Sequence, residues 1–180
     1  MGRSRFPVFL AAVSLLAAAC SREAPAADRD AQFLAAENAA EAPLLPTNAY
    51  ALPEFDLTEF ERLIGQLRGT AVYVNVWGSW CPPCRQEAPF LASAHAKYGD
   101  HVQFLGIDIL DSRESARAFM QEFGWTYPSV FDPGGAIRDG LGYIGQPISI
   151  FYDERGEVVA DFAGPLTEAL LGRYLERLAG

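Results

Sequence analysis

A buried strand that leads directly into a helix opened by two cysteines constrains this chain more than any other feature. Ala71 to Trp77 is an almost unbroken run of apolar and β-branched residues, which predicts a strand covered on both faces of a sheet. Cys81-Pro82-Pro83-Cys84 follows, and it opens a predicted helix that Gly99-Asp100 terminates. Because a sheet covered on both faces needs helices on both sides, we expect an α/β sandwich.

The remaining segments predict a mixed sheet. Val102 to Ile109 is a second buried strand, and strand, crossover helix and strand together form a parallel unit. Ile148 to Tyr152 and Glu157 to Phe162 flank an Asp-Glu-Arg-Gly turn and predict a β-hairpin. Hydrophobic spacing predicts helices over 57–67, 112–123 and 166–178, and a short strand over 129–131.

Length and charge limit the classes of function. A chain of 180 residues that is half apolar can bury one sizeable core, so we expect one domain with an N-terminal appendage. We also expect a monomer. Acidic residues outnumber basic ones 23 to 14, with a net charge of −9. Nucleic acids and anionic membrane surfaces require clustered Lys and Arg, so we expect neither nucleic acid nor such a surface as a partner.

Residues 1–20 have the pattern of an export signal. Arg3 and Arg5 precede an apolar stretch from Phe6 to Ala19, which is shorter than the roughly 20 residues that a membrane span needs. Cys20 follows Leu-Leu-Ala-Ala-Ala and resembles the lipobox cysteine of bacterial lipoproteins, although Ala17 stands where Leu is usual. The resemblance implies that Cys20 is lipidated. An ordinary cleaved signal peptide and a retained membrane anchor are the alternatives.

The segment between the signal and the domain differs in composition from both. Residues 21–49 are rich in Ala, Pro and Glu and carry little apolar periodicity, so we predict a flexible tether. The folded domain is expected over residues 50–180.

The position of the two cysteines predicts redox chemistry. A helix N-terminus offers unpaired N–H groups and a positive dipole end, both of which lower the pKa of a cysteine and favour the reactive thiolate. Cys81 is therefore the predicted nucleophile. Cys84 lies on the same helical face and can attack a mixed disulfide formed at Cys81. Pro82 and Pro83 suit the first helical turn and stiffen the link between the sulfurs.

Other interpretations of the cysteine pair have less support. A zinc site needs further ligands, and the domain offers only His95 and His101 and no third cysteine, so we expect no metal. A structural disulfide across two residues closes almost no chain and gains little stability. Gly134-Gly135 predicts a turn after Asp-Pro, not a phosphate-binding loop. We therefore expect no cofactor beyond a redox-active disulfide between Cys81 and Cys84.

The motif resembles a known family. The string from Val74 to Pro89, Val-Asn-Val-Trp-x-Ser-Trp-Cys-Pro-Pro-Cys-Arg-x-Glu-x-Pro, is similar to the membrane-anchored thioredoxins of the TlpA and ResA type, thiol-disulfide oxidoreductases with a redoxin, or AhpC/TSA-like, thioredoxin domain. The similarity extends over about Tyr73 to Gly164 and includes the pair Tyr127-Pro128. It implies a thioredoxin fold, a mixed central β-sheet flanked by helices, with a helix-strand insertion in the long connection from Ile109 to Gln146.

The resemblance also implies roles for single residues. Asn75 stands where ordinary thioredoxins have a buried, titrating Asp, so that base is absent. Glu87 matches a Glu that adjusts cysteine reactivity in the family, although a favourable charge in the first helical turns is its other interpretation. Pro89 matches a helix-kinking proline. Pro147 matches the cis-proline that faces the disulfide. Trp80 belongs to the motif as a supporting residue.

Two departures from the family leave substrate choice open. The residue before the proline is Gln146, where the family often has a small aliphatic side chain, and Ile148 follows it where Thr is common.

The family implies an extracytoplasmic reductase, periplasmic or held at the membrane by its N-terminal lipid. Its substrates would be disulfides in partner proteins, such as the haem-binding cysteines of apocytochrome c during cytochrome c biogenesis, and a membrane thiol transporter would supply electrons. An oxidant that introduces disulfides into secreted proteins is the main alternative. A Cu(I)-delivery module and a pure binding module have less support, and a peroxidase motif is missing.

Overall fold

The computed structural model describes residues 42–180, which form one compact unit. The predicted signal peptide and lipobox of residues 1–20, with Cys20, and the tether residues 21–41 lie outside the described residues. Among the residues described, no helix is both long and apolar enough to cross a membrane.

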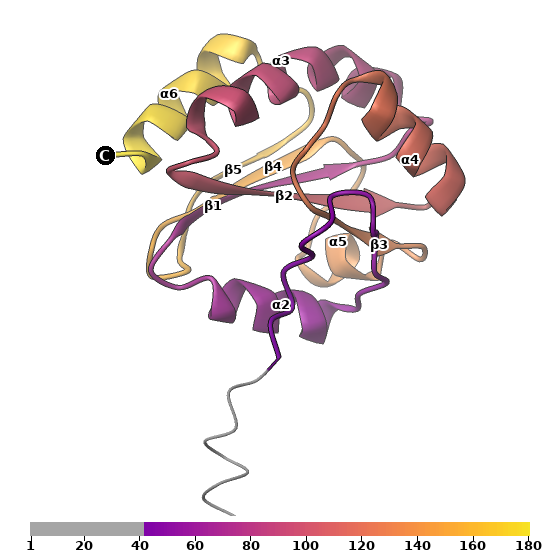
Figure 1. Cartoon of the computed structure of the whole chain (residues 1–180), viewed down its shortest axis with the longest axis horizontal. Helices are drawn as coiled ribbons and strands as arrows, with labels where there is room; N and C mark the ends of the chain where they lie inside the picture. Colours follow the sequence, from indigo (N-terminus) through magenta and orange to yellow (C-terminus); the bar gives the residue numbers. More distant parts are fainter. Residues whose placement is uncertain (1–41) are drawn as a thin grey trace, which may run out of the picture. The chain divides into compact units, whose positions relative to one another are not determined.

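A five-stranded mixed sheet forms the centre of the domain (Figure 1). Its strands lie in the order β3-β2-β1-β4-β5. The central strand β1 pairs in parallel with β2 and antiparallel with β4, and β3 and β5 form the edges. The strand bounds are β1 (Ala71–Trp77), β2 (Val102–Ile109), β3 (Ser129–Asp132), β4 (Ile148–Tyr152) and β5 (Val158–Ala163).

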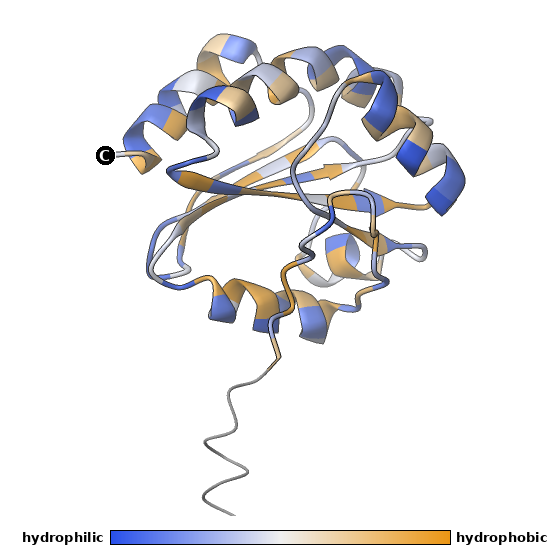
Figure 2. Ribbon diagram, in the orientation of Figure 1, coloured by the Kyte–Doolittle hydropathy of each residue, from blue (hydrophilic) through white to orange (hydrophobic). Residues whose placement is uncertain are grey.

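Helices cover both faces of the sheet, as Figure 1 shows, so the expected α/β sandwich is confirmed. The helices of one face are α3 (Pro82–Tyr98), α4 (Arg113–Glu122) and α6 (Glu168–Leu178), and those of the other are α2 (Leu57–Gln66) and α5 (Ala136–Gly140). Side chains alternate along β1, so that Tyr73 and Trp77 join the core under α3 while Val72, Val74 and Val76 join the core against α2. Figure 2 shows the matching hydropathy, with apolar strands and apolar inner helix faces.

Side-chain caps fix where the helices begin. The Asp56 carboxylate accepts the Glu59 N–H at 2.8 Å, and the Glu59 carboxylate accepts the Asp56 N–H at 3.1 Å, which is a capping box at α2. Ser112 caps α4 and Thr167 caps α6 with a single hydrogen bond each, in which the hydroxyl accepts a backbone N–H. Each such cap contributes about 1 kcal/mol.

The folded unit begins at Ala42, earlier than the sequence predicts. The Leu44 N–H donates to Gln66 Oε1 at 2.9 Å, and Gln66 Nε2 donates back to the Ala42 carbonyl at 3.1 Å. Leu44 and Leu45 pack against the α2-side core, so residues 42–49 belong to the domain and not to the tether.

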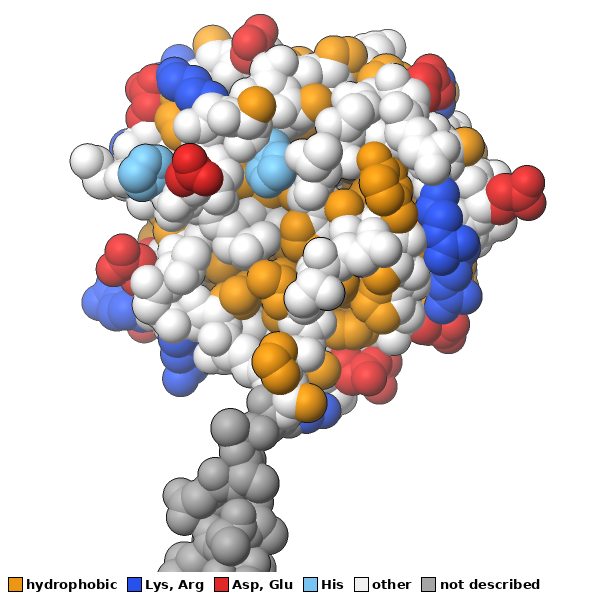
Figure 3. Space-filling model, viewed as in Figure 1, with side chains coloured by type: hydrophobic (Ala, Val, Ile, Leu, Met, Phe, Trp, Pro, Cys, Tyr) orange, Lys and Arg blue, Asp and Glu red, His pale blue; other side chains and the backbone are white. Residues whose placement is uncertain are grey.

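On the face seen in Figure 3, apolar side chains gather in the middle and charges of both signs lie around them.

The long connection between β2 and β4 contains the expected helix and strand, α4 and β3. It also contains α5, which the sequence did not predict. Five residues are too few to establish a helical period, and the start of α5 is held by the Asp132 carboxylate, which accepts the N–H groups of Ala136 and Ile137 at 2.8 Å.

Candidate active site

The redox pair lies where β1 ends and α3 begins. A four-residue turn from Gly78 to Cys81 is closed by the Cys81 N–H, which donates to the Gly78 carbonyl at 3.1 Å. Cys81 is the N-cap of α3, and its Sγ accepts the Cys84 N–H at 3.2 Å. The two sulfurs form a disulfide, with both side chains 2% exposed. Cys81 thus occupies the position that favours a thiolate.

The residues next to the cysteines lie where the motif predicts. Pro82 and Pro83 occupy the first positions of α3, where a missing N–H leaves no helical hydrogen bond unmade. The Trp80 side chain is 49% exposed, which makes it one of the few large apolar side chains on the surface of the described domain. Pro89 lies inside α3, as the family pattern implies.

A backbone carbonyl faces the nucleophile from another loop. The Gln146-Pro147 peptide bond is cis, and the Gln146 carbonyl oxygen lies 4.0 Å from Cys81 Sγ. Pro147 directly precedes β4, which pairs with β1 at Val76 and Ile148. The sheet therefore brings Cys81 and Pro147 together, although 65 residues separate Cys81 from Gln146.

Glu87 is a buried carboxyl group on the helix that carries both cysteines. It lies one turn beyond Cys84 and is 2% exposed. Its Oε1 accepts the backbone N–H of Leu166, and its Oε2 has no hydrogen-bond partner within residues 42–180. Burial raises the pKa of Glu87 to about 7, and the Leu166 hydrogen bond opposes this only in part. The site therefore contains a group that changes charge near neutral pH.

Asn75 is buried on β1, at the position where ordinary thioredoxins carry an acid. An amide cannot titrate, so Asn75 provides no base.

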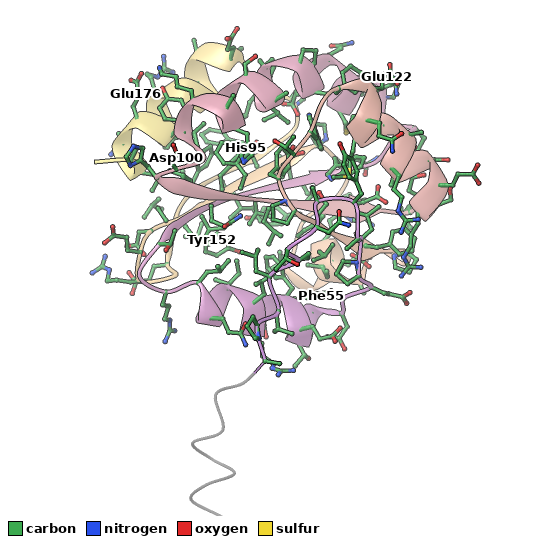
Figure 4. The ribbon with its side chains drawn as sticks, in the orientation of Figure 1. Phe55, His95, Asp100, Glu122, Tyr152 and Glu176 are labelled. Carbon is green, nitrogen blue, oxygen red and sulfur yellow. A yellow bond between two sulfur atoms is a disulfide. The ribbon has the colours of Figure 1, made fainter. Side chains whose placement is uncertain are left out.

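His95 packs between α3 and the sheet against Phe104 and Tyr127, and Figure 4 shows it on the inner side of α3.

Two aspartates near the redox turn escape prediction from the sequence. Asp108 is fully buried on β2, in register with Trp77, and burial raises its pKa to about 9, with the nearby Asp111 carboxylate adding to the shift. Asp111 Oδ2 accepts the Ser79 N–H at 2.7 Å. The sequence held one signal for Asp108: it is an acidic residue within the apolar run of β2, and β2 lies next to β1, the strand that leads to the cysteines.

Comparison with known proteins places this geometry in a family. The model of the AhpC/TSA family matches residues 49–161, which is more than half of the chain. The chain belongs to the AhpC/TSA family. This AhpC/TSA chain is 28% identical to the thiol-disulfide oxidoreductase ResA of Bacillus thuringiensis subsp. konkukian over 130 residues, which cover 70% of the chain and 75% of ResA.

Solved structures resemble the AhpC/TSA chain in fold. A thiol:disulfide interchange protein of the thioredoxin family from Chlorobium tepidum matches with a TM-score of 0.59 and 29% identity, covering 64% of this chain and 84% of that one. A secreted thiol-disulfide isomerase from Corynebacterium glutamicum matches with a TM-score of 0.59 and 28% identity, covering 64% and 74%. The AhpC/TSA chain has the thioredoxin fold that its sequence implied.

The AhpC/TSA chain is a thiol-disulfide oxidoreductase. The cysteine pair at the start of α3 can exist as the disulfide seen here or as a dithiol, and thiolate attack interconverts the two. The family and the matched oxidoreductases establish this class of activity.

Proposed function

We propose that the protein reduces disulfides of partner proteins outside the cytoplasm. The reduced Cys81 thiolate attacks one sulfur of the partner disulfide, forms a mixed disulfide and releases the partner's other sulfur as a thiolate, which takes up a proton. The Cys84 thiolate then attacks Cys81 Sγ and releases the second partner thiol. The partner gains two electrons and two protons, and the enzyme ends with the Cys81–Cys84 disulfide.

One observation carries the proposal: Cys81 is the N-cap of α3 and faces the carbonyl of Gln146. The Cys84 N–H and the helix dipole stabilise a thiolate at Cys81. The Gln146 carbonyl lies 4.0 Å from Cys81 Sγ and so offers backbone beside the sulfur, where an extended substrate segment can lie.

The buried carboxyl of Glu87 favours the reductase direction. It lies on the same helical face as Cys84 and one turn away, where groups on a helix interact. Once ionised, a buried carboxylate disfavours nearby thiolates. A less stable dithiol form gives up its electrons more readily, and this lowers the reduction potential of the pair.

The proposal includes partners and location. The match to the oxidoreductase ResA supports protein disulfides as substrates, and the resemblance to membrane-anchored thioredoxins supports the haem-binding cysteines of apocytochrome c among them and a membrane thiol protein as electron donor. Residues 1–20 support export and a lipid anchor at Cys20, and the matched isomerase of Corynebacterium glutamicum is secreted. We propose that the protein acts as a monomer with no cofactor beyond its own cysteine pair.

The equilibrium reduction potential of Cys81 and Cys84 tests the direction. The mature protein is equilibrated in thiol/disulfide buffers, and its thiols are trapped with a mass tag. A potential of about −250 mV or lower, in the range of reducing thioredoxins, supports a reductase. A potential near about −120 mV, as in strongly oxidising thioredoxin-fold proteins, contradicts it and favours an oxidant.

A peptide assay tests the substrate. We expect the reduced protein to reduce an oxidised Cys-x-x-Cys-His peptide, the pattern of c-type haem attachment, faster than a matched peptide without the His and its flanking sequence. Equal rates for the two peptides contradict the cytochrome c assignment and leave the reductase assignment intact.

A further inference from the structure

Asp111, just before the cap of helix α4, and Arg85, which is paired with the end of α4, contact both backbone polar groups of Ser79. The Ser79 N–H donates to Asp111 Oδ2 at 2.7 Å, and Arg85 Nη1 approaches the Ser79 carbonyl at 3.5 Å. Asp111 directly precedes Ser112, the N-cap of α4, and Arg85 pairs with Glu122, the last residue of α4. Figure 4 shows Glu122 on α4 at the end next to α3. The redox turn is thus tied to both ends of this helix.

Asp111 is itself held in a fixed orientation. Its Oδ1 accepts the Ser112 N–H at 2.7 Å, so both carboxylate oxygens bind backbone N–H groups. The preceding residue, Leu110, has φ of 53°, in the left-handed region that a Leu rarely adopts, and its side chain is 45% exposed. Burial of the Leu110 side chain therefore does not account for this backbone conformation, which directly precedes Asp111.

Arg85 has a second set of contacts that fix it against α4. Its guanidinium lies over the rings of Phe119 and Phe123, 5.4 and 5.1 Å from their centroids. Because Arg85 directly follows Cys84, these contacts also join α4 to the start of α3.

The redox turn has little freedom on its other side. A Cβ built on Gly78 would lie 2.9 Å from Trp80 Nε1 and 3.2 Å from the Ile109 carbonyl, so the turn packs directly on the end of β2. Ser79 occupies the second position of the turn that the Cys81 N–H closes. A hydrogen bond at Ser79 therefore restrains the backbone two residues before Cys81, which carries the reactive sulfur.

We propose that Asp111 is a positioning residue for Cys81, acting by binding the Ser79 N–H. Through this hydrogen bond, helix α4 sets the orientation of the turn and hence of Cys81 Sγ relative to an incoming disulfide. The inference rests on thiol-disulfide exchange at Cys81 and is independent of the direction of electron flow. Asp111 touches no reacting atom.

Two substitutions remove this hydrogen bond from opposite ends. Asp111→Ala removes the acceptor. Ser79→Pro removes the donor together with the Ser hydroxyl, and Pro suits the second position of a turn. The matched controls are Ser79→Ala, which keeps the N–H, and Glu114→Gln, which removes one negative charge from an exposed position in the first turn of α4. Asp111→Asn keeps one side-chain oxygen that can accept from Ser79.

The readout is the rate constant of exchange with a small disulfide, measured in both directions on the full mature protein. We expect Asp111→Ala and Ser79→Pro to lower both rate constants about tenfold, because misplacement of a reacting group reduces rate steeply. We expect Asp111→Asn to recover most of the loss and both controls to match the unmodified protein.

If Asp111 only stabilises the fold and does not position Cys81, the result is different. In that case the melting temperature falls, while exchange well below that temperature stays within about twofold of the unmodified protein, and the proposal is overturned. It is also overturned if only one of the two main variants loses rate while both remain folded. Since a positioning loss changes forward and reverse rate constants by the same factor, it leaves the reduction potential unchanged. The reduction potential of the cysteine pair therefore tests the reductase assignment, and the exchange rate constants test the role of Asp111.

Discussion

The carboxylate of Glu87 accepts the backbone N–H of Leu166, which lies 79 residues further along the chain. This hydrogen bond ties α3, which carries both cysteines, to the segment that leads into α6. Because Oε2 of the same carboxyl has no partner in the described domain and burial is nearly complete, the protonated form is favoured and the pKa rises to about 7.

The first prediction concerns Glu87 and the pH dependence of stability. A carboxyl whose pKa is higher in the folded state contributes stability that is fully present below its unfolded pKa, 4.5, and is lost as the pH rises through about 7. We expect the unmodified protein to lose roughly 3 kcal/mol relative to Glu87→Gln over that interval. Urea unfolding of the oxidised proteins from pH 4 to pH 9 measures this difference. A difference that does not change with pH would show that the pKa of Glu87 is the same in the folded and the unfolded protein, which contradicts the burial argument.

The second prediction separates Asp108 from Glu87. The pKa of Asp108 is raised from 3.8 to about 9, so its contribution to stability declines over a wider interval and continues to decline above neutral pH. We expect the stability difference between the unmodified protein and Asp108→Asn to level off near pH 9, whereas that for Glu87→Gln levels off near pH 7. Thermal unfolding in a pH series reports both. Levelling off below pH 6 for Asp108→Asn contradicts the burial argument.

Local signals explain why most of the fold could be predicted from sequence. The run Val102–Ile109 and the cap Ser112 delimit β2 and the start of α4 as predicted, because burial and capping act within a few residues. Cys81 and Cys84 could be predicted as the redox pair because their reactivity depends on their place at the start of one helix, which is a local feature of the sequence. Pro147 was placed beside Cys81 only through the family resemblance.

The features that escaped prediction depend on contacts between distant segments. Leu44 and Leu45 form an apolar pair too short to establish a period, and only α2 gives them a surface to pack on. Asp111 lies in a loop, where its sequence neighbours give no indication that the Ser79 N–H is its partner. Asp108 is an acidic residue within an apolar strand. Such a residue indicates a site of interest, but the sequence does not show which side chains surround it.

The third prediction assigns the nucleophile. We expect Cys84→Ser to attack an oxidised peptide through Cys81 and to accumulate a mixed disulfide, because nothing resolves it. Cys81→Ser should form no such adduct, and its exchange should fall to the uncatalysed rate, since Cys84 lies beyond the N-cap in the helix. Intact-protein mass spectrometry detects the adduct. An adduct on Cys84 in Cys81→Ser would reverse the assignment.

The last prediction concerns Gly106, whose position leaves no room for a side chain. A Cβ there would lie 2.2 Å from Ser129 Oγ and 2.8 Å from Trp77 Nε1, and the Trp77 ring is held by stacking on Phe119 at 4.7 Å. Because stacking holds Trp77 and Ser129 is fully buried, we expect Gly106→Ala to destabilise the domain by about 2–3 kcal/mol through overpacking.

Gly134→Ala is the matched control for Gly106→Ala, because no atom lies within 4 Å of a Cβ at that position. We expect its stability to stay within about 0.5 kcal/mol of the unmodified protein in urea unfolding. Ser129→Ala combined with Gly106→Ala should be less destabilised than the sum of the single variants, because removal of Oγ relieves the closest contact. Equal stability of Gly106→Ala and Gly134→Ala would mean that Ser129 and Trp77 can move aside, and that the core beneath the redox turn is looser than these distances indicate.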